Sequence, residues 1–151
     1  MASPFVQALV LGGSIAAAHP PQPTTLGDPK LDYLLHCGGC HGAAGQGAPK
    51  QGIPRLAGEV AKLLHVPSGR LYIMQVPGVS NNSLDNAKTA ELLNWLVAHF
   101  DAADMPPDFV PFTKAELATY RQRGGGAVLE RRASVAAALK DQGIVLGSYD
   151  P

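Results

Sequence analysis

The chain has 151 residues, and its 12 basic and 12 acidic residues balance to a formal net charge of zero. A balanced chain lacks the basic excess with which proteins contact nucleic-acid phosphates, so we expect no nucleic-acid partner. Hydrophobic residues make up 46% of the chain, which is enough for one domain with one core, and the 13 prolines and 17 glycines favour short helices joined by irregular loops.

The N-terminal stretch has the pattern of an export signal. Residues 1–29 contain no Lys or Arg, and the apolar residues 5–18 end in three alanines, which are small residues of the kind found at signal cleavage sites. We therefore predict that residues 1–18 are a signal peptide or N-terminal apolar segment and that the chain is exported to the periplasm. The apolar stretch is short for a membrane span, so we expect membrane attachment only if the segment stays uncleaved.

A helix is predicted next, directly before the two cysteines of the chain. Asp28 has the side chain of an N-cap, and Pro29 suits the first helical position. Leu31, Leu34 and Leu35 follow at helical spacing. The cysteines should therefore come at the C-terminal end of a helix.

Both cysteines lie in the sequence Cys37-Gly38-Gly39-Cys40-His41, which is the Cys-x-x-Cys-His attachment motif of c-type haem. Two thiols three positions apart on one helical turn can form thioethers to the two vinyl groups of a haem. The imidazole of the next residue then lies beneath the iron. The motif predicts one covalently bound haem c, tethered by Cys37 and Cys40, with His41 as an iron ligand.

Two other readings of the cysteine pair have weaker support. A thioredoxin-type dithiol should follow a strand, whereas a helix is expected here. A zinc site would need His41 and one of His36, His65 or His99, because the chain has no second closely spaced pair of ligands. We therefore expect no zinc.

The segment after the motif resembles class I cytochrome c. That family continues Cys-His-Gly-x-x-Gly-x-Gly and then, after a variable loop, Pro-x-Leu-x-Gly. This chain has Gly42, Gly45 and Gly47, followed by Pro54-Arg55-Leu56-Ala57-Gly58. The resemblance covers about residues 28–58. It implies an all-α fold, a small cytochrome c-like helical domain wrapped around one covalently attached haem, in which the Pro54 carbonyl accepts the Nδ1 proton of the proximal ligand His41.

Two segments follow with different patterns. Residues 71–76 are the only candidate for an extended segment. Residues 85–100 have the strongest amphipathic pattern in the chain, because apolar side chains recur at three- and four-residue spacings, and they should form a core helix. These side chains are Leu92, Leu93, Leu96, Val97 and Phe100, with Trp95 beside them.

The sixth iron ligand is open between two methionines. Met105 precedes Pro106, as in the Met-Pro element that supplies this ligand in many class I cytochromes, and it is the preferred ligand. Met74 is the alternative, because it also precedes a helix that resembles the family's closing helix. A histidine such as His65 or His99, or a vacant position, is the remaining option. A thioether ligand gives a high-potential electron carrier, whereas a vacant position permits gas or peroxide chemistry.

The C-terminal part predicts two more helices. Residues 113–116, Thr-Lys-Ala-Glu, form a capping box that opens a helix with Leu117 and Tyr120 inward, and the glycines at 124–126 should end it. A last helix has Val128, Val135 and Leu139 on one stripe, and the residues after 140 should be loosely held. Residues 19–123 would then be the cytochrome c domain, and residues 124–151 a C-terminal helix with a loose tail.

These patterns predict a periplasmic monohaem c-type cytochrome that transfers single electrons between redox proteins. Its partners would be a dehydrogenase as donor and an oxidase or another cytochrome as acceptor. No paired acid and base groups indicate a substrate pocket, so we do not expect an enzyme. The alternatives are an electron-accepting subunit of a periplasmic dehydrogenase, and a haem enzyme or sensor with an open sixth position.

An acidic run affects the choice of partner if it lies near the haem. Asp101, Asp104 and Asp108 flank Met105, the preferred sixth ligand. On that reading they predict a partner with a basic docking face.

Overall fold

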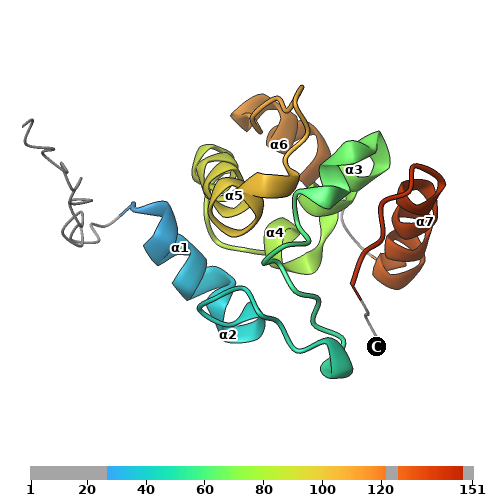
Figure 1. Cartoon of the computed structure of the whole chain (residues 1–151). Helices are drawn as coiled ribbons and strands as arrows, with labels where there is room; N and C mark the ends of the chain where they lie inside the picture. The colour runs from blue at the N-terminus through green and yellow to red at the C-terminus, as the bar shows by residue number, and fades with distance from the viewer. Residues whose placement is uncertain (1–26, 122–125, 148–151) are drawn as a thin grey trace, which may run out of the picture.

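The computed structural model describes residues 27–121 and 126–147, and every regular element in them is helical (Figure 1). No strand occurs in this part of the chain, which confirms the predicted all-α class. The predicted signal segment, residues 1–18, lies outside the described residues. The α-helices are α1 (Pro29–His36), α2 (Gly38–His41), α3 (Pro67–Gln75), α4 (Pro77–Ser80), α5 (Asn86–Asp101), α6 (Lys114–Tyr120) and α7 (Val128–Asp141), and the 3-10 helices are η1 (Pro49–Gln51), η2 (Lys62–His65) and η3 (Ala102–Asp104).

Three helices begin at side-chain caps that satisfy their first N–H groups. The Asp28 carboxylate accepts from the Lys30 N–H at 2.8 Å before α1, with Pro29 at the first helical position as predicted. The carboxylate of Asp85 caps α5, and the Thr113 hydroxyl accepts from the Glu116 N–H at 3.2 Å at the start of α6. Such a cap stabilises a helix by about 1 kcal/mol.

Helix α5 is the centre of the core, and α1 and α6 both pack against it (Figure 1). Its predicted apolar face is buried, with Leu92, Leu93, Leu96 and Val97 all among the core residues. From α1, the Tyr33 ring contacts the α5 aromatics Trp95 and Phe100, with ring centroids 5.8 and 4.8 Å apart. Among the described residues, no helix is long and apolar enough to cross a membrane.

The predicted extended segment 71–76 is wrong, because residues 71–75 are the second half of helix α3. Pro67 occupies the first position of this helix, where its fixed φ is favourable and its missing N–H costs nothing. The helical turn then places Tyr72, Ile73 and Met74 in the core. An apolar run that has no neighbouring strand to pair with satisfies its backbone groups better in a helix.

Helix α6 differs from the prediction at its C-terminal end. It ends at Tyr120, before the glycines, of which Gly124 and Gly125 lie outside the described residues. Leu117 is buried as predicted, but Tyr120 is 37% exposed and does not point inward. The buried residue after this helix is Arg121, whose guanidinium donates to carbonyl oxygens of α4 and of the loop between α4 and α5.

The C-terminal segment is better ordered than predicted. Helix α7 packs against α3 and η2, and the predicted stripe of Val135 and Leu139 is buried. Ile144 pairs its N–H with the Leu139 carbonyl at 3.0 Å, and the Gly147 N–H donates to the Glu59 carboxylate at 2.8 Å. Residues 143–147 are therefore fastened to the domain, and only residues 148–151 of the predicted loose tail lie outside the described part.

Candidate functional site

The Cys-x-x-Cys-His motif forms a separate helical turn, α2, directly after α1. The Cys37 N–H donates to the Tyr33 carbonyl at 2.8 Å and ends α1, while the Cys37 carbonyl accepts from the His41 N–H at 2.9 Å and begins the next turn. This break between the helices brings Cys37, Cys40 and His41 together on one turn. Both cysteines are free thiols, with Cys37 half-buried and Cys40 exposed.

All three motif side chains border one cavity of about 350 Å³. Its volume is within the range of about 300–1,000 Å³ typical of ligand and cofactor sites. The rest of the wall comes from the end of α1, from residues 52–63, and from α3, α4, α5 and α7. Most of these wall residues are apolar. The apolar members are Ile53, Pro54, Leu56, Val60, Leu63, Ile73, Val76, Pro77, Val79, Leu93, Leu96 and Val128.

The imidazole of His41 is oriented by the backbone of the loop. Its Nδ1–H donates to the Pro54 carbonyl at 2.9 Å, so Nε2 is the ring nitrogen that can bind a metal. Burial lowers the pKa of His41, and the hydrogen bond to Pro54 acts in the opposite direction. The imidazole is therefore neutral at neutral pH, which is the form that ligates iron.

The close approach of the loop to the His41–Pro54 hydrogen bond requires a glycine at position 47. Gly47 has φ of +60°, and its N–H donates to the His41 carbonyl at 2.8 Å. A Cβ at Gly47 would lie only 2.5 Å from the Pro54 oxygen, the atom that accepts from His41. The glycine thus lets the two halves of the loop approach closely enough to hold the imidazole.

A buried tyrosine joins α1 to the same loop. The Tyr33 hydroxyl donates to the Gly42 carbonyl at 2.5 Å. Burial and the nearby Cys37 raise the pKa of Tyr33 to about 12, although the Gly45 N–H lowers it, so the hydroxyl keeps its proton throughout the physiological range. The first residue after the motif is therefore anchored to the helix before it.

The Cys37 thiol has the wrong acidity for a thioredoxin-type centre. Burial, and to a smaller extent Cys40, raise the pKa of Cys37 to about 11. Disulfide exchange needs a thiolate and hence a lowered thiol pKa. Cys37 stays protonated at neutral pH in this environment. In the described part of the chain, no group of three or more His, Cys, Asp and Glu side chains could hold a metal ion.

The structure does not bring either candidate methionine to this cavity. Met74 is 2% exposed within the core, and α3 borders the cavity through Tyr72 and Ile73 instead. Met105 follows η3, is partly buried against the core, and is not among the residues that border the cavity.

The histidines that were considered as ligands have other neighbours. The His65 Nε2–H donates to the Asp104 carbonyl at 2.8 Å, and the His99 ring stacks on Trp95 at 4.4 Å. Neither borders the cavity, whereas His36 does.

One buried charged residue of the cavity was missed in the sequence. Arg132 of α7 is 8% exposed and contributes to the wall, together with Arg55 and Glu59. A signal for it exists, because Arg132 follows Val128 by four positions and precedes Val135 by three, which puts it on the apolar stripe of α7. A cation on a buried stripe indicates a specific partner.

One member of the acidic run, Asp101, is buried and cannot contribute to the predicted docking face. Asp101 is 5% exposed, and its carboxylate accepts from the Ala61 N–H at 2.8 Å, so it serves the fold. Asp104 lies 3.9 Å from the Lys62 ammonium. Asp104 and Asp108 are exposed, and none of the three acidic residues borders the cavity.

No protein-family model matches the chain, and no curated protein resembles it significantly. A functional assignment therefore depends on the motif and on the geometry of the cavity.

Proposed function

We propose that this chain is a monohaem c-type cytochrome that transfers single electrons between periplasmic redox proteins. One observation carries the proposal: the two free thiols and the imidazole of the Cys-x-x-Cys-His motif border a single, mainly apolar cavity, and the Nδ1 of His41 is already bonded to Pro54. A haem in this cavity would supply a one-electron iron couple.

The residues of the cavity fit such a group. Cys37 and Cys40 would tether it through two thioethers, and His41 would bind its iron through Nε2. Pro54 would keep the imidazole in one tautomer and raise its basicity. Apolar residues from α3 and α5, such as Ile73 and Leu96, would exclude water from the iron, which is one of the means by which proteins adjust a reduction potential.

Export to the periplasm and protein partners belong to the same proposal. Covalent haem attachment in bacteria takes place outside the cytoplasmic membrane, which agrees with the signal-like residues 1–18. A dehydrogenase donor and an oxidase or cytochrome acceptor remain the partners we propose. We assign the chain electron transfer without a catalytic reaction of its own.

An open sixth position is the second candidate, and the place of the methionines favours it. Neither Met74 nor Met105 borders the cavity among the described residues, so a thioether ligand would require a rearrangement. The oxidised protein should then lack the weak long-wavelength absorption band of iron–thioether ligation. Added imidazole should bind to the ferric iron and change the Soret spectrum in proportion to its concentration.

The proposal is tested by haem retention under denaturing conditions. Haem should stay with the polypeptide through acid-acetone extraction and should stain the band on a denaturing gel. The double variant Cys37→Ser with Cys40→Ser should lose this staining, whereas Met74→Leu, which changes a core residue outside the cavity, should keep it. Extraction of the haem from the wild-type protein would refute covalent attachment.

A further inference from the structure

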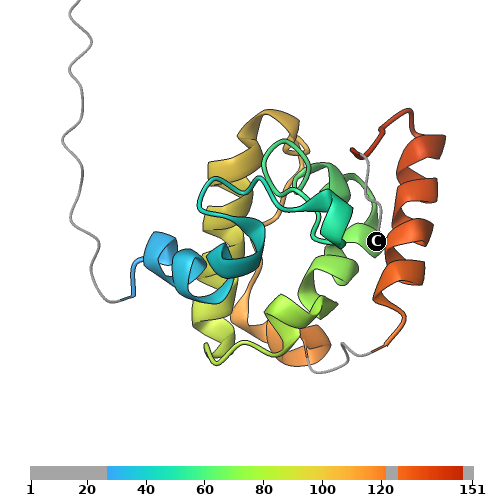
Figure 2. The same cartoon turned by 90° about the horizontal axis from the view of Figure 1, so that it is seen from below.

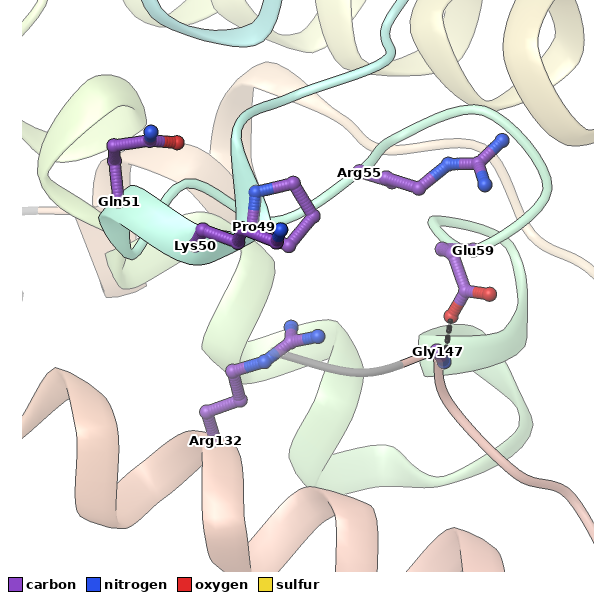
Figure 3. A pocket seen from close by; sticks show the side chains of 7 residues that line it. All are labelled: Pro49, Lys50, Gln51, Arg55, Glu59, Arg132 and Gly147. Carbon is purple, nitrogen blue, oxygen red and sulfur yellow. Dashed lines mark hydrogen bonds between the residues drawn. The ribbon is translucent and has the colours of Figure 1, made fainter. Parts of the chain in front are cut away.

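A second cavity adjoins the first and shares three of its residues. It has a volume of about 590 Å³ and is lined by residues of η1, the following loop, α7 and the C-terminal segment (Figure 3). Arg55, Glu59 and Arg132 border both cavities. The apolar cavity of the motif therefore continues, on one side, into a space with charged walls.

The charge of this second space is positive. Three cations, Lys50, Arg55 and Arg132, line it together with one carboxylate, that of Glu59. Glu59 already accepts from the Gly147 N–H at 2.8 Å (Figure 3). It also accepts from the Lys62 ammonium at 3.3 Å. The space thus has the charge of a site for an anion.

Arg132 is the residue that marks this site most clearly. It is 8% exposed, and it occupies a stripe of α7 whose other members are apolar and packed. A buried cation is costly unless charged or polar groups surround it, and a guanidinium suits a carboxylate because two parallel N–H groups can bind both oxygens.

We propose that Arg132, assisted by Arg55, binds the propionate carboxylates of the haem, so that α7 is part of the haem site. The inference rests on the proposed function. A haem carries its vinyl groups on one edge and its two propionates on the other. Helix α2, which contains Cys40 and follows Cys37 directly, and helix α7 lie on different sides of the molecule, with α3 and α4 between them (Figure 2). Residues of α3 and α4 border the cavity.

On this proposal, helix α7 and the residues after it help to form the haem site. Helix α7 brings Arg132 to the cavity, and the bond from Gly147 to Glu59 fastens the following residues beside it. A guanidinium near the iron disfavours the additional positive charge of the ferric state, so Arg132 raises the reduction potential.

The test compares single arginine variants of the holoprotein. Arg132→Gln should shift the propionate bending mode in the resonance Raman spectrum and lower the midpoint potential. Arg131→Gln is the matched control, because Arg131 precedes Arg132 on α7, borders neither cavity and donates to Gln75 at 3.3 Å. It should leave both values as in the wild type. Arg132→Lys keeps the charge but not the paired N–H groups, so it should shift the Raman mode and largely restore the potential.

The outcomes separate this inference from the proposed function. If wild-type protein retains haem covalently but Arg132→Gln leaves the Raman mode unchanged, the propionate contact is wrong while the cytochrome assignment stands. A lower potential without a Raman shift would likewise overturn it, because a distant charge alone would explain that result. If Arg132→Gln does not yield folded holoprotein, Arg55→Gln decides by the same two readouts, since Arg55 is exposed. Haem lost from the wild type would refute the proposed function itself.

Discussion

Substitution of Gly47 by alanine tests the geometry that holds the proximal imidazole. Two costs add at this position. The backbone has φ of +60°, which costs an alanine about 1 kcal/mol relative to glycine. The new Cβ would also lie 2.5 Å from the Pro54 oxygen and 2.7 Å from the Ile53 oxygen, so the loop must shift.

The second cost can be isolated because the chain contains a matched glycine. Gly58 has φ of +70°, but a Cβ there would meet no atom within 4 Å. Gly58→Ala should therefore show the backbone strain alone. Gly47→Ala should lose about 1.5 kcal/mol more, the net value of the displaced His41–Pro54 hydrogen bond and its contacts, which is about a tenfold difference in the unfolding equilibrium constant.

Denaturant unfolding of both apoprotein variants measures this difference directly. For a chain of this size, a loss of 1 kcal/mol lowers Tm by about 2–4 °C, so the melting temperatures of the two variants should also be resolved. Equal losses in Gly47→Ala and Gly58→Ala would refute the close approach of residue 47 to the Pro54 carbonyl. In the holoprotein, Gly47→Ala should alter the iron–histidine bond, whereas Gly58→Ala should not.

Three further predictions concern the core, a buried cation and pH. Met74→Ala should lower the free energy of unfolding by about 2–5 kcal/mol as a core truncation, and Met105→Ala should lower it less. Both variants should leave the visible spectrum of the holoprotein unchanged. A changed spectrum in either would identify that methionine as an iron ligand. Arg121→Met should lower the free energy of unfolding, measured with denaturant, by about 3 kcal/mol. The substitution removes five hydrogen bonds, among them those to the Val79 and Leu84 carbonyls. A loss below about 1 kcal/mol would contradict this prediction. Burial raises the pKa of Asp101, so the stability contributed by the protonated carboxyl is present at low pH and is lost as pH rises through the folded-state pKa. The Tm of the wild type, measured relative to that of Asp101→Asn, should therefore fall between about pH 4 and pH 7. Parallel Tm profiles of the two proteins would contradict this prediction.

Local sequence signals predicted the helices that have their own caps and apolar faces. Asp28 and Thr113 each cap a helix at the expected residue, and the buried face of α5 follows its 3.6-residue pattern. These features depend on neighbours within one or two turns. The Cys-x-x-Cys-His motif is of the same kind, because its three side chains share one turn.

Features set by distant contacts were not predictable in this way. The run at residues 71–76 suits a strand by composition, but it becomes helical because it packs on the core beside α7 and η2. Residues 143–147 have no regular pattern, and their order comes from Glu59, which is far away in sequence.

The positions of the two methionines at the candidate site also depend on distant contacts that the sequence does not reveal. Spacing after the motif made Met105 and Met74 reasonable sixth ligands. Which side of a helix faces the cavity depends on how α3 and α5 pack, and that packing turns Met74 into the core. Arg132 was missed for a related reason, since only the approach of α7 to the loop at Arg55 brings it to the cavity.

The central claim is that Cys37 and Cys40 both carry one haem. Intact mass spectrometry of the denatured protein, produced in cells with a periplasmic haem-attachment system and treated with a thiol-alkylating reagent, tests it most directly. We predict the mass of the polypeptide plus one haem, with no alkylated cysteine. A haem-free mass with two alkylated cysteines would contradict the account.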